Sequence, residues 1–259
     1  MRIVIITQDE PFYLAKNLSY LIKILPEHSE IVGCVVADVS PFGKKESFLK
    51  KAKKTFDVFG LFFFSYYSFK YLVSKFNSKT NVFKLLNLND IPIITLEYPI
   101  NNINSVNKIK LFKPDLLVSI LGNQIFKEPI LNLAPKGCIN LHTALLPKYR
   151  GLMPTFWVLK NNEKKTGVSV FFVDKGIDSG PIIVQEEVEI GNRTQEELIL
   201  HTKKLGMEAI AKSIDLIQKE EVQLIVNDVS QKTYFTFPTR RDVLEFKRNG
   251  KKFLSDKYY

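Results

Sequence analysis

Three polar side chains whose types and spacing could do chemistry lie within residues 137–181. Asn140 and His142 stand two residues apart at the end of a short apolar run, and Asp178 follows a second apolar run in a glycine-rich turn. Residues two apart on a strand project from the same face. An amide and an imidazole are therefore predicted to point to one place, on the strand ends and loops where catalytic residues often lie.

The chemistry that these groups favour is acyl transfer without a protein nucleophile. A carboxylate near an imidazole raises its basicity and fixes its orientation, which gives a general acid or base near neutral pH. An amide N–H can stabilise the oxyanion of an attacked carbonyl. No serine or cysteine stands beside His142. A structural interpretation stays open, in which His142 only makes hydrogen bonds and Asn140 satisfies a turn.

The apolar runs around these residues predict a parallel α/β sheet. Runs at 2–7, 31–36 and 115–121 have the composition of buried strands, and apolar residues at helical spacing over 12–25 separate the first two. Alternating strands and helices are typical of a parallel sheet. No GxGxxG pattern follows the first strand, so no dinucleotide fingerprint is present. Further strands are predicted at 91–95, 139–141, 166–173, 182–190 and 222–226, and helices at 106–112 and from a capping box at Thr194 to about residue 219.

Two sequence runs resemble the signature of the formyltransferases that use 10-formyltetrahydrofolate. They are INLHTALLPKYRG and, at the expected distance, DKGIDSGPI. That family includes glycinamide ribonucleotide formyltransferase, methionyl-tRNA formyltransferase and the nucleotide-sugar N-formyltransferases. Its pattern Asn-x-His-x-Ser-Leu-Leu-Pro is matched at Asn140 and His142, whereas Thr143 and Ala144 stand where proline and serine are usual. The resemblance implies that Asn140, His142 and Asp178 are catalytic.

The resemblance also implies the fold and the co-substrate. The fold would be α/β, with a Rossmann-like, mostly parallel sheet, helices on both faces and a small C-terminal appendage. Residues 1–219 would form the catalytic domain and residues 220–259 the appendage. The co-substrate 10-formyltetrahydrofolate would lie between two loops, with no metal. Its contacts are expected at Gln124, Ile125, Phe126, Val173, Asp174, Lys175, Gly176 and Ile177. The residues themselves indicate that Gly122 lets the backbone turn after the strand at 115–121 and that Asn123 and Gln124 expose polar groups there.

The acceptor is expected to be a primary amine, most simply that of a nucleotide-linked amino sugar. Lys148 and Arg150 would contact its pyrophosphate, and the sugar N-formyltransferases share this chain length. Methionyl-tRNA formyltransferase-like activity is the alternative. The excess of basic residues favours this alternative. Against it, only residues 220–259 follow the last long helix, and methionyl-tRNA formyltransferases carry a tRNA-binding domain at that place. Hydrolysis of the formyl donor is a further alternative, since deformylases share the core.

Two segments carry most of the net charge of +10. Residues 42–86 contain ten basic against two acidic residues, and residues 231–259 contain eight against three. Such segments suit a phosphate-bearing partner, whether a nucleotide, a nucleic acid or an anionic membrane. Solvated lysine-rich faces are the other interpretation.

The strongly aromatic segment 58–73 is too short and too interrupted to predict a transmembrane span. It is predicted to form a buried or half-buried helix. The alternative is an interfacial helix that contacts a membrane or the second subunit of a homodimer. A non-catalytic protein that acts at a membrane surface through this segment is the function class that rivals an enzyme.

The composition is that of a globular protein with a full core: 259 residues, 45% hydrophobic and 25% charged. Cys34 and Cys138 lie in apolar runs and are interpreted as small buried hydrophobes in a reducing compartment. The three histidines, at 28, 142 and 201, are too widely spaced for a zinc pattern. The first ten residues carry charge and no long apolar core, so no signal peptide is predicted and a cytoplasmic location is expected.

Overall fold

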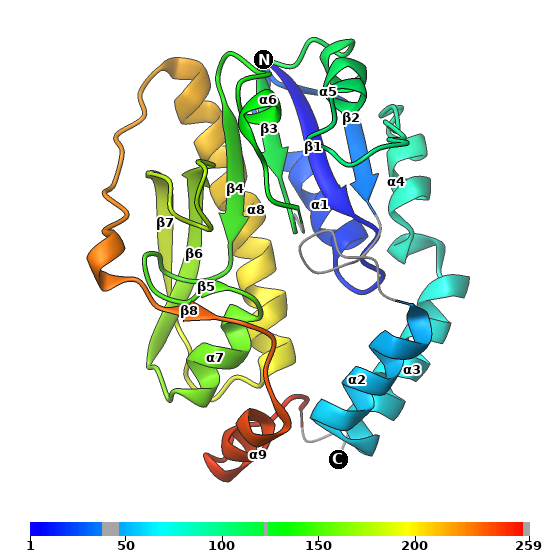
Figure 1. Cartoon of the computed structure of the whole chain (residues 1–259), viewed down its shortest axis with the longest axis vertical. Coiled ribbons are helices and arrows are strands. Elements are labelled where there is room, and N and C mark those ends of the chain that lie inside the picture. Colours follow the sequence, from blue (N-terminus) through cyan, green and yellow to red (C-terminus); the bar gives the residue numbers. More distant parts are fainter. Residues whose placement is uncertain (38–46, 122–123, 256–259) are drawn as a thin grey trace.

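The computed structural model of the chain describes residues 1–37, 47–121 and 124–255, so Gly122 and Asn123 lie outside the described residues. A six-stranded sheet runs through its centre in the order β2-β1-β3-β4-β6-β7 (Figure 1). The first four of these strands are parallel and the last two are antiparallel to their neighbours. The predicted mostly parallel α/β sheet is confirmed. The strands are β1 (Arg2–Gln8), β2 (Glu30–Ala37), β3 (Leu116–Ser119), β4 (Cys138–His142), β6 (Lys165–Phe172) and β7 (Ile182–Glu189).

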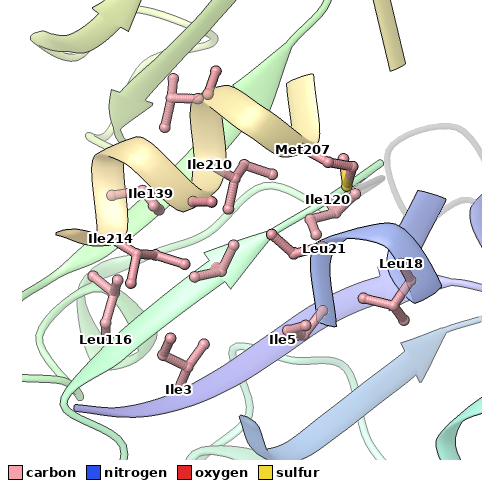
Figure 2. Packing of buried hydrophobic residues seen from close by; sticks show 14 of the residues in the cluster. Ile3, Ile5, Leu18, Leu21, Leu116, Ile120, Ile139, Met207, Ile210 and Ile214 are labelled. Atoms are coloured by element: carbon pink, nitrogen blue, oxygen red, sulfur yellow. The ribbon is translucent and has the colours of Figure 1, made fainter. Parts of the chain in front are cut away.

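Helices cover both faces of the sheet because both faces of its strands are apolar. Successive side chains of β1 point to opposite sides. Ile3 and Ile5 pack on the side of α1 and α8, where Figure 2 shows them, and Val4 and Ile6 pack on the other side. Burying each such side chain contributes about 1.5–3 kcal/mol. One face is covered by α1 (Leu14–Ile24), α4 (Val82–Leu88) and α8 (Gln195–Lys219), and the other by α5 (Ile103–Lys110) and α6 (Glu128–Leu131).

The long helix α8 begins where the capping box predicts. The Thr194 hydroxyl accepts a hydrogen bond from the Glu197 backbone N–H at 3.3 Å, and the Glu197 carboxylate accepts one from the Thr194 backbone N–H at 2.9 Å. Two backbone donors of the first turn are thereby satisfied. The helix then crosses the sheet and places its apolar side against β4, β6 and β7.

Two predicted strands and one predicted helix differ from the structure. Segments 91–95 and 222–226 form only single bridges, Cys34 to Ile93 and Ile182 to Ile225. In the first segment Pro92 has no N–H to donate, which interrupts a ladder. The helix predicted at 106–112 lies earlier, at Ile103–Lys110, because the Asn102 side chain caps it by accepting from the Asn104 N–H at 2.9 Å.

The aromatic segment folds into two helices. α2 (Phe48–Phe59) and α3 (Leu61–Phe76) are separated by Gly60, whose φ of +86° lies in the region that favours glycine. The helical prediction for 58–73 is confirmed, and the segment is half-buried: Phe63 and Tyr67 pack inward, while other aromatic side chains face solvent. No described helix is both long and apolar enough to cross a membrane.

The residues after α8 pack onto the body of the protein. β8 (Tyr234–Phe235) pairs in parallel with β5 (Arg150–Gly151), and a second hydrophobic cluster forms among α7, α9 and the end of α2. Within it Phe156 stacks on Phe246, and Phe246 stacks on Phe253. The division of the chain at 219/220 stays a prediction. In this part of the structure α7 spans Pro154–Lys160 and α9 spans Arg240–Arg248. Two short 3-10 helices are η2 (Ser78–Thr80) and η3 (Val229–Gln231). Both cysteines are buried free thiols.

Candidate active site

A cavity of about 520 Å³ opens at the carboxyl ends of β1, β3 and β4. This is the edge at which open α/β sheets bind ligands. Asn140, His142 and Asp178 all line the cavity. Asn140 and His142 reach it from one strand, β4, and Asp178 from the loop between β6 and β7. The structure thus brings the three predicted catalytic residues together.

His142 is buried, and a backbone carbonyl fixes the orientation of its ring. Nε2 lies 2.7 Å from the carbonyl oxygen of Tyr149. A carbonyl can only accept, so Nε2 carries the hydrogen and Nδ1 is the nitrogen whose proton can come and go. Nδ1 lies 3.6 Å from Oδ2 of Asp178. That separation exceeds a hydrogen bond, but it places both groups where they can exchange a proton with one bound group.

Asp178 is held from several sides. Its Oδ2 accepts a hydrogen bond from the Gly151 backbone N–H at 2.9 Å, and its backbone sits at a φ of +49°. Its carbonyl oxygen accepts from Nδ2 of Asn227 at 3.0 Å, and the same Nδ2 donates to the Gly180 carbonyl at 2.9 Å. The aspartate loop is therefore fixed in part by a residue of the C-terminal segment.

Asn140 presents a polar atom that the chain itself leaves unsatisfied. Its Oδ1 is buried and has no hydrogen-bond partner among the described residues. Buried polar atoms are nearly always paired, so an exception on a cavity wall points to a bound group that completes the pairing. The side-chain amide of Asn140 offers such a group both an acceptor and a donor.

Residues of both loops that were predicted to hold the co-substrate line the cavity. Asp174 is already engaged within its own loop, where Oδ1 accepts from the Gly176 N–H at 2.9 Å and from the Ser179 hydroxyl. Lys175 points away and forms an exposed ion pair with Glu128 at 2.6 Å, which raises the pKa of Lys175 and lowers that of Glu128. The predicted residues that line the cavity are Gln124, Ile125, Phe126, Val173, Asp174, Gly176 and Ile177.

The structure does not bring Lys148 and Arg150 to the cavity. Lys148 is exposed, and Arg150 is buried with its guanidinium 2.8 Å from Oδ1 of Asn227. Arg150 therefore supports Asn227, which in turn binds the carbonyl of Asp178. Thr143, one of the two departures from the family pattern, lines the cavity, whereas Ala144 is fully buried beneath the loop.

Sequence reasoning missed the wall formed by helices α1 and α8. Lys203 on α8 lines the cavity with Asn17 and Met207. Burial lowers the pKa of Lys203, and the nearby Glu10 carboxylate partly offsets this shift. The signal was present in the sequence, because Lys203 falls at helical spacing between Ile199 and Met207 on the apolar stripe of the helix. Within the described ranges no cluster of three His, Cys, Asp or Glu side chains could hold a metal ion.

The fold is shared with solved formyltransferase structures. Phosphoribosylglycinamide formyltransferase from Anaplasma phagocytophilum superposes with a TM-score of 0.64 at 15% identity, over 92% of this chain and 99% of its own. The N-formyltransferase from Helicobacter canadensis, in complex with folinic acid and dTDP-3-aminofucose, gives 0.59 at 18% identity, over 99% of this chain and 81% of its own. Fold and site thus place the chain in the class of α/β proteins with the formyltransferase architecture.

Sequence similarity points to the same family. The family model described as "Formyl transferase" matches residues 97–214. Methionyl-tRNA formyltransferase of Alkaliphilus oremlandii is 42% identical over 144 residues, which is 55% of this chain and 46% of the relative. Residues 97–214 are thus similar to the formyl transferase family. The match spans about half the length of the curated relatives.

Replacing Asn227 tests whether the C-terminal segment holds the aspartate loop. Asn227→Ala leaves the Arg150 guanidinium and the carbonyls of Asp178 and Gly180 without their partner. Unsatisfied buried groups of this kind cost about 1–3 kcal/mol. Urea unfolding should show a loss in that range, whereas the exposed Asn192→Ala should be neutral. An unchanged midpoint for Asn227→Ala would contradict the supporting role.

Replacing Lys203 tests the cost of its burial. Its folded-state pKa lies below the unfolded value, so the charged form is penalised in the folded protein. This penalty is complete below the folded pKa and disappears as the pH rises toward the ordinary lysine pKa. Lys203→Met should therefore raise the thermal midpoint at neutral pH, and the gain should shrink as the solution becomes alkaline. The exposed Lys204→Met serves as control, and a gain that does not depend on pH would refute the explanation.

Proposed function

We propose that the protein transfers the formyl group of 10-formyltetrahydrofolate to a primary amine. The observation that carries the proposal is the convergence of Asn140, His142 and Asp178 on one cavity wall, with the His142 ring oriented by Tyr149. These groups supply an amide, an imidazole and a carboxylate, and the region that contains them matches the formyl transferase family.

The cavity suits a folate as co-substrate. The exposed Ile125 and Ile177 and the buried Phe126 offer apolar surface on its two loop walls. The unsatisfied Oδ1 of Asn140 offers a hydrogen-bond acceptor at the wall formed by β4. A site of this size with mostly apolar walls and a few polar groups is typical of small-molecule binding.

The proposed mechanism follows from the atoms that the chain presents. When bound, 10-formyltetrahydrofolate supplies an activated formyl carbon. The Asn140 amide donates a hydrogen bond to the formyl oxygen as negative charge develops on it. The acceptor amine attacks in its neutral form, and the proton that it loses passes to Asp178 or Nδ1 of His142. The same pair then returns the proton to the departing nitrogen. The old C–N bond breaks after the new one has formed, and the carbonyl is restored.

Substitution of the three residues tests these roles. His142→Ala and Asp178→Asn should each lower kcat by about 10²–10⁴ because they remove proton transfer, and Asn140→Ala by about 10²–10³ because it removes an oxyanion donor. Formylation is measured by mass spectrometry, and circular dichroism checks the fold. The exposed His201→Ala is the matched control and should keep full activity. Substantial turnover in both His142→Ala and Asp178→Asn would reject the assignment.

Methionyl-tRNA is the first candidate acceptor that we propose. The supporting observation is that two curated relatives, at 42% and 37% identity, are methionyl-tRNA formyltransferases. Each match covers about half of the relative's own length. The nucleotide-sugar acceptor expected from the sequence therefore becomes the second candidate.

A nucleotide-linked amino sugar is supported by a different observation. The structure of the Helicobacter canadensis enzyme in complex with dTDP-3-aminofucose covers 99% of this chain, including the residues after α8. Those residues support Asp178 through Asn227. A likeness of fold that extends over this segment supports the sugar acceptor as the second candidate.

An acceptor panel separates the two candidates. The full chain is incubated with 10-formyltetrahydrofolate and either methionyl-tRNA, glycinamide ribonucleotide or dTDP-linked amino sugars, with His142→Ala as the inactive control. A gain of one formyl mass on methionyl-tRNA alone is expected. A gain on the sugars alone selects the second candidate, and release of formate without any formylated amine would replace transfer by hydrolysis.

A further inference from the structure

Helix α3 exposes a row of apolar side chains along one side. Phe69, Leu72, Val73 and Phe76, which we term the α3 stripe, recur at spacings of three, four or seven residues and so share one helical face. Phe69 is 69% exposed and Phe76 is 91% exposed. The other side of the helix packs inward. The stripe is therefore surface that the described part of the chain does not cover.

Helices α2 and α3 pack against each other as a hairpin, residues 48–76, which we term the α2–α3 hairpin. Helix α2 adds further exposed apolar side chains to it. Phe48 and Leu49 are both largely exposed, at 66% and 79%. The ring of Phe48 lies 6.0 Å from that of Tyr71, so the start of α2 adjoins the end of α3. Exposed apolar side chains that gather on one part of a surface, rather than singly, mark contact sites.

The hairpin is also strongly basic. Residues 47–86 contain eight lysines against one acidic residue, Asp57, which Lys53 already neutralises at 2.6 Å. Helix α9 lies beside α2, where Arg240 donates to the Asp57 carbonyl at 3.4 Å. Residues 239–255 add six basic residues against two acidic ones. The helices α2, α3 and α9 lie at one end of the molecule (Figure 1). That end thus combines exposed apolar side chains with an excess of basic residues.

We propose that the α2–α3 hairpin binds the surface of an anionic lipid bilayer. The α3 stripe would enter the boundary between headgroups and acyl chains, and the lysines would face the negative headgroups. With 16 residues, α3 is short of the roughly 20 that a spanning helix needs. The hairpin therefore lies on the bilayer instead of crossing it. It also lies outside residues 97–214, the region that defines the family.

The same features disfavour other occupants. Phe69 and Phe76 could stack on nucleobases, but the aliphatic Leu72 and Val73 on the same face could not. A lipid boundary accommodates all four side chains, so the stripe fits lipid better than single-stranded RNA. In a two-fold dimer the hairpin would meet its own copy, and two surfaces with the same positive charge would repel each other. Charge complementarity and side-chain type together select the anionic bilayer.

Vesicle sedimentation with the full chain tests this proposal. The protein should sediment with phosphatidylcholine vesicles that contain phosphatidylglycerol, should stay in solution with pure phosphatidylcholine, and should be released by salt. The triple variant Phe69→Ser, Leu72→Ser and Phe76→Ser should bind at least about tenfold more weakly. The matched control Ile103→Ser and Leu111→Ser replaces side chains that are 62% and 78% exposed, at the start of α5 and directly after its end, and it should bind normally.

A charge variant and a fold check complete the test. Lys50→Gln, Lys75→Gln and Lys79→Gln should weaken binding to the anionic vesicles by about tenfold, which tests the proposal independently if the triple serine variant does not fold. Circular dichroism should be unchanged in each variant. Failure to sediment at low salt, equal binding by the stripe and control variants, an RNA complex that vesicles do not displace, or a dimer that the serine variant abolishes would each overturn the proposal.

Discussion

The hydrogen bond from the Gly151 N–H to the Asp178 carboxylate is the contact on which the site depends. It joins the two signature runs, which are otherwise separated by α7 and β6. Gly151 has a φ of +94°, and a Cβ there would lie 2.3 Å from the Phe235 carbonyl oxygen. Only glycine allows this close approach. The aspartate position is thus fixed by backbone geometry as much as by side chains.

The C-terminal segment takes part in the site that it adjoins. β8 pairs with the short strand β5, which contains Gly151, and Asn227 binds the carbonyls of Asp178 and Gly180. Arg150 completes this arrangement from within the protein by binding Asn227. Residues far apart in the chain therefore share one small network, and small shifts in such a network change the geometry of a catalytic group.

The α2–α3 hairpin is connected to the cavity through the second hydrophobic cluster. Phe59, at the end of α2, stacks on Phe63 and lies 5.8 Å from the ring of Phe237, which lines the cavity. The ammonium group of Lys54, also on α2, lies over the same Phe237 ring, 4.4 Å from its centre. Binding of the α2–α3 hairpin to a bilayer would therefore hold the cavity close to that bilayer. The hairpin reaches the cavity through these contacts although it lies outside residues 97–214.

The sequence by itself determined the sheet, the start of α8 and the residue types of the site. These features depend on local patterns: β-branched runs, a capping box at Thr194, and the spacing that sends Asn140 and His142 to one face. Only the tertiary structure decided that Arg150 turns inward to Asn227 and that Lys203 joins the cavity wall. It also decided that Lys175 pairs with Glu128 instead of lining the cavity. Helical periodicity places Lys203 on the apolar side of α8, but it does not say what that side meets. Each of the three outcomes depends on which distant segments come together when the chain folds.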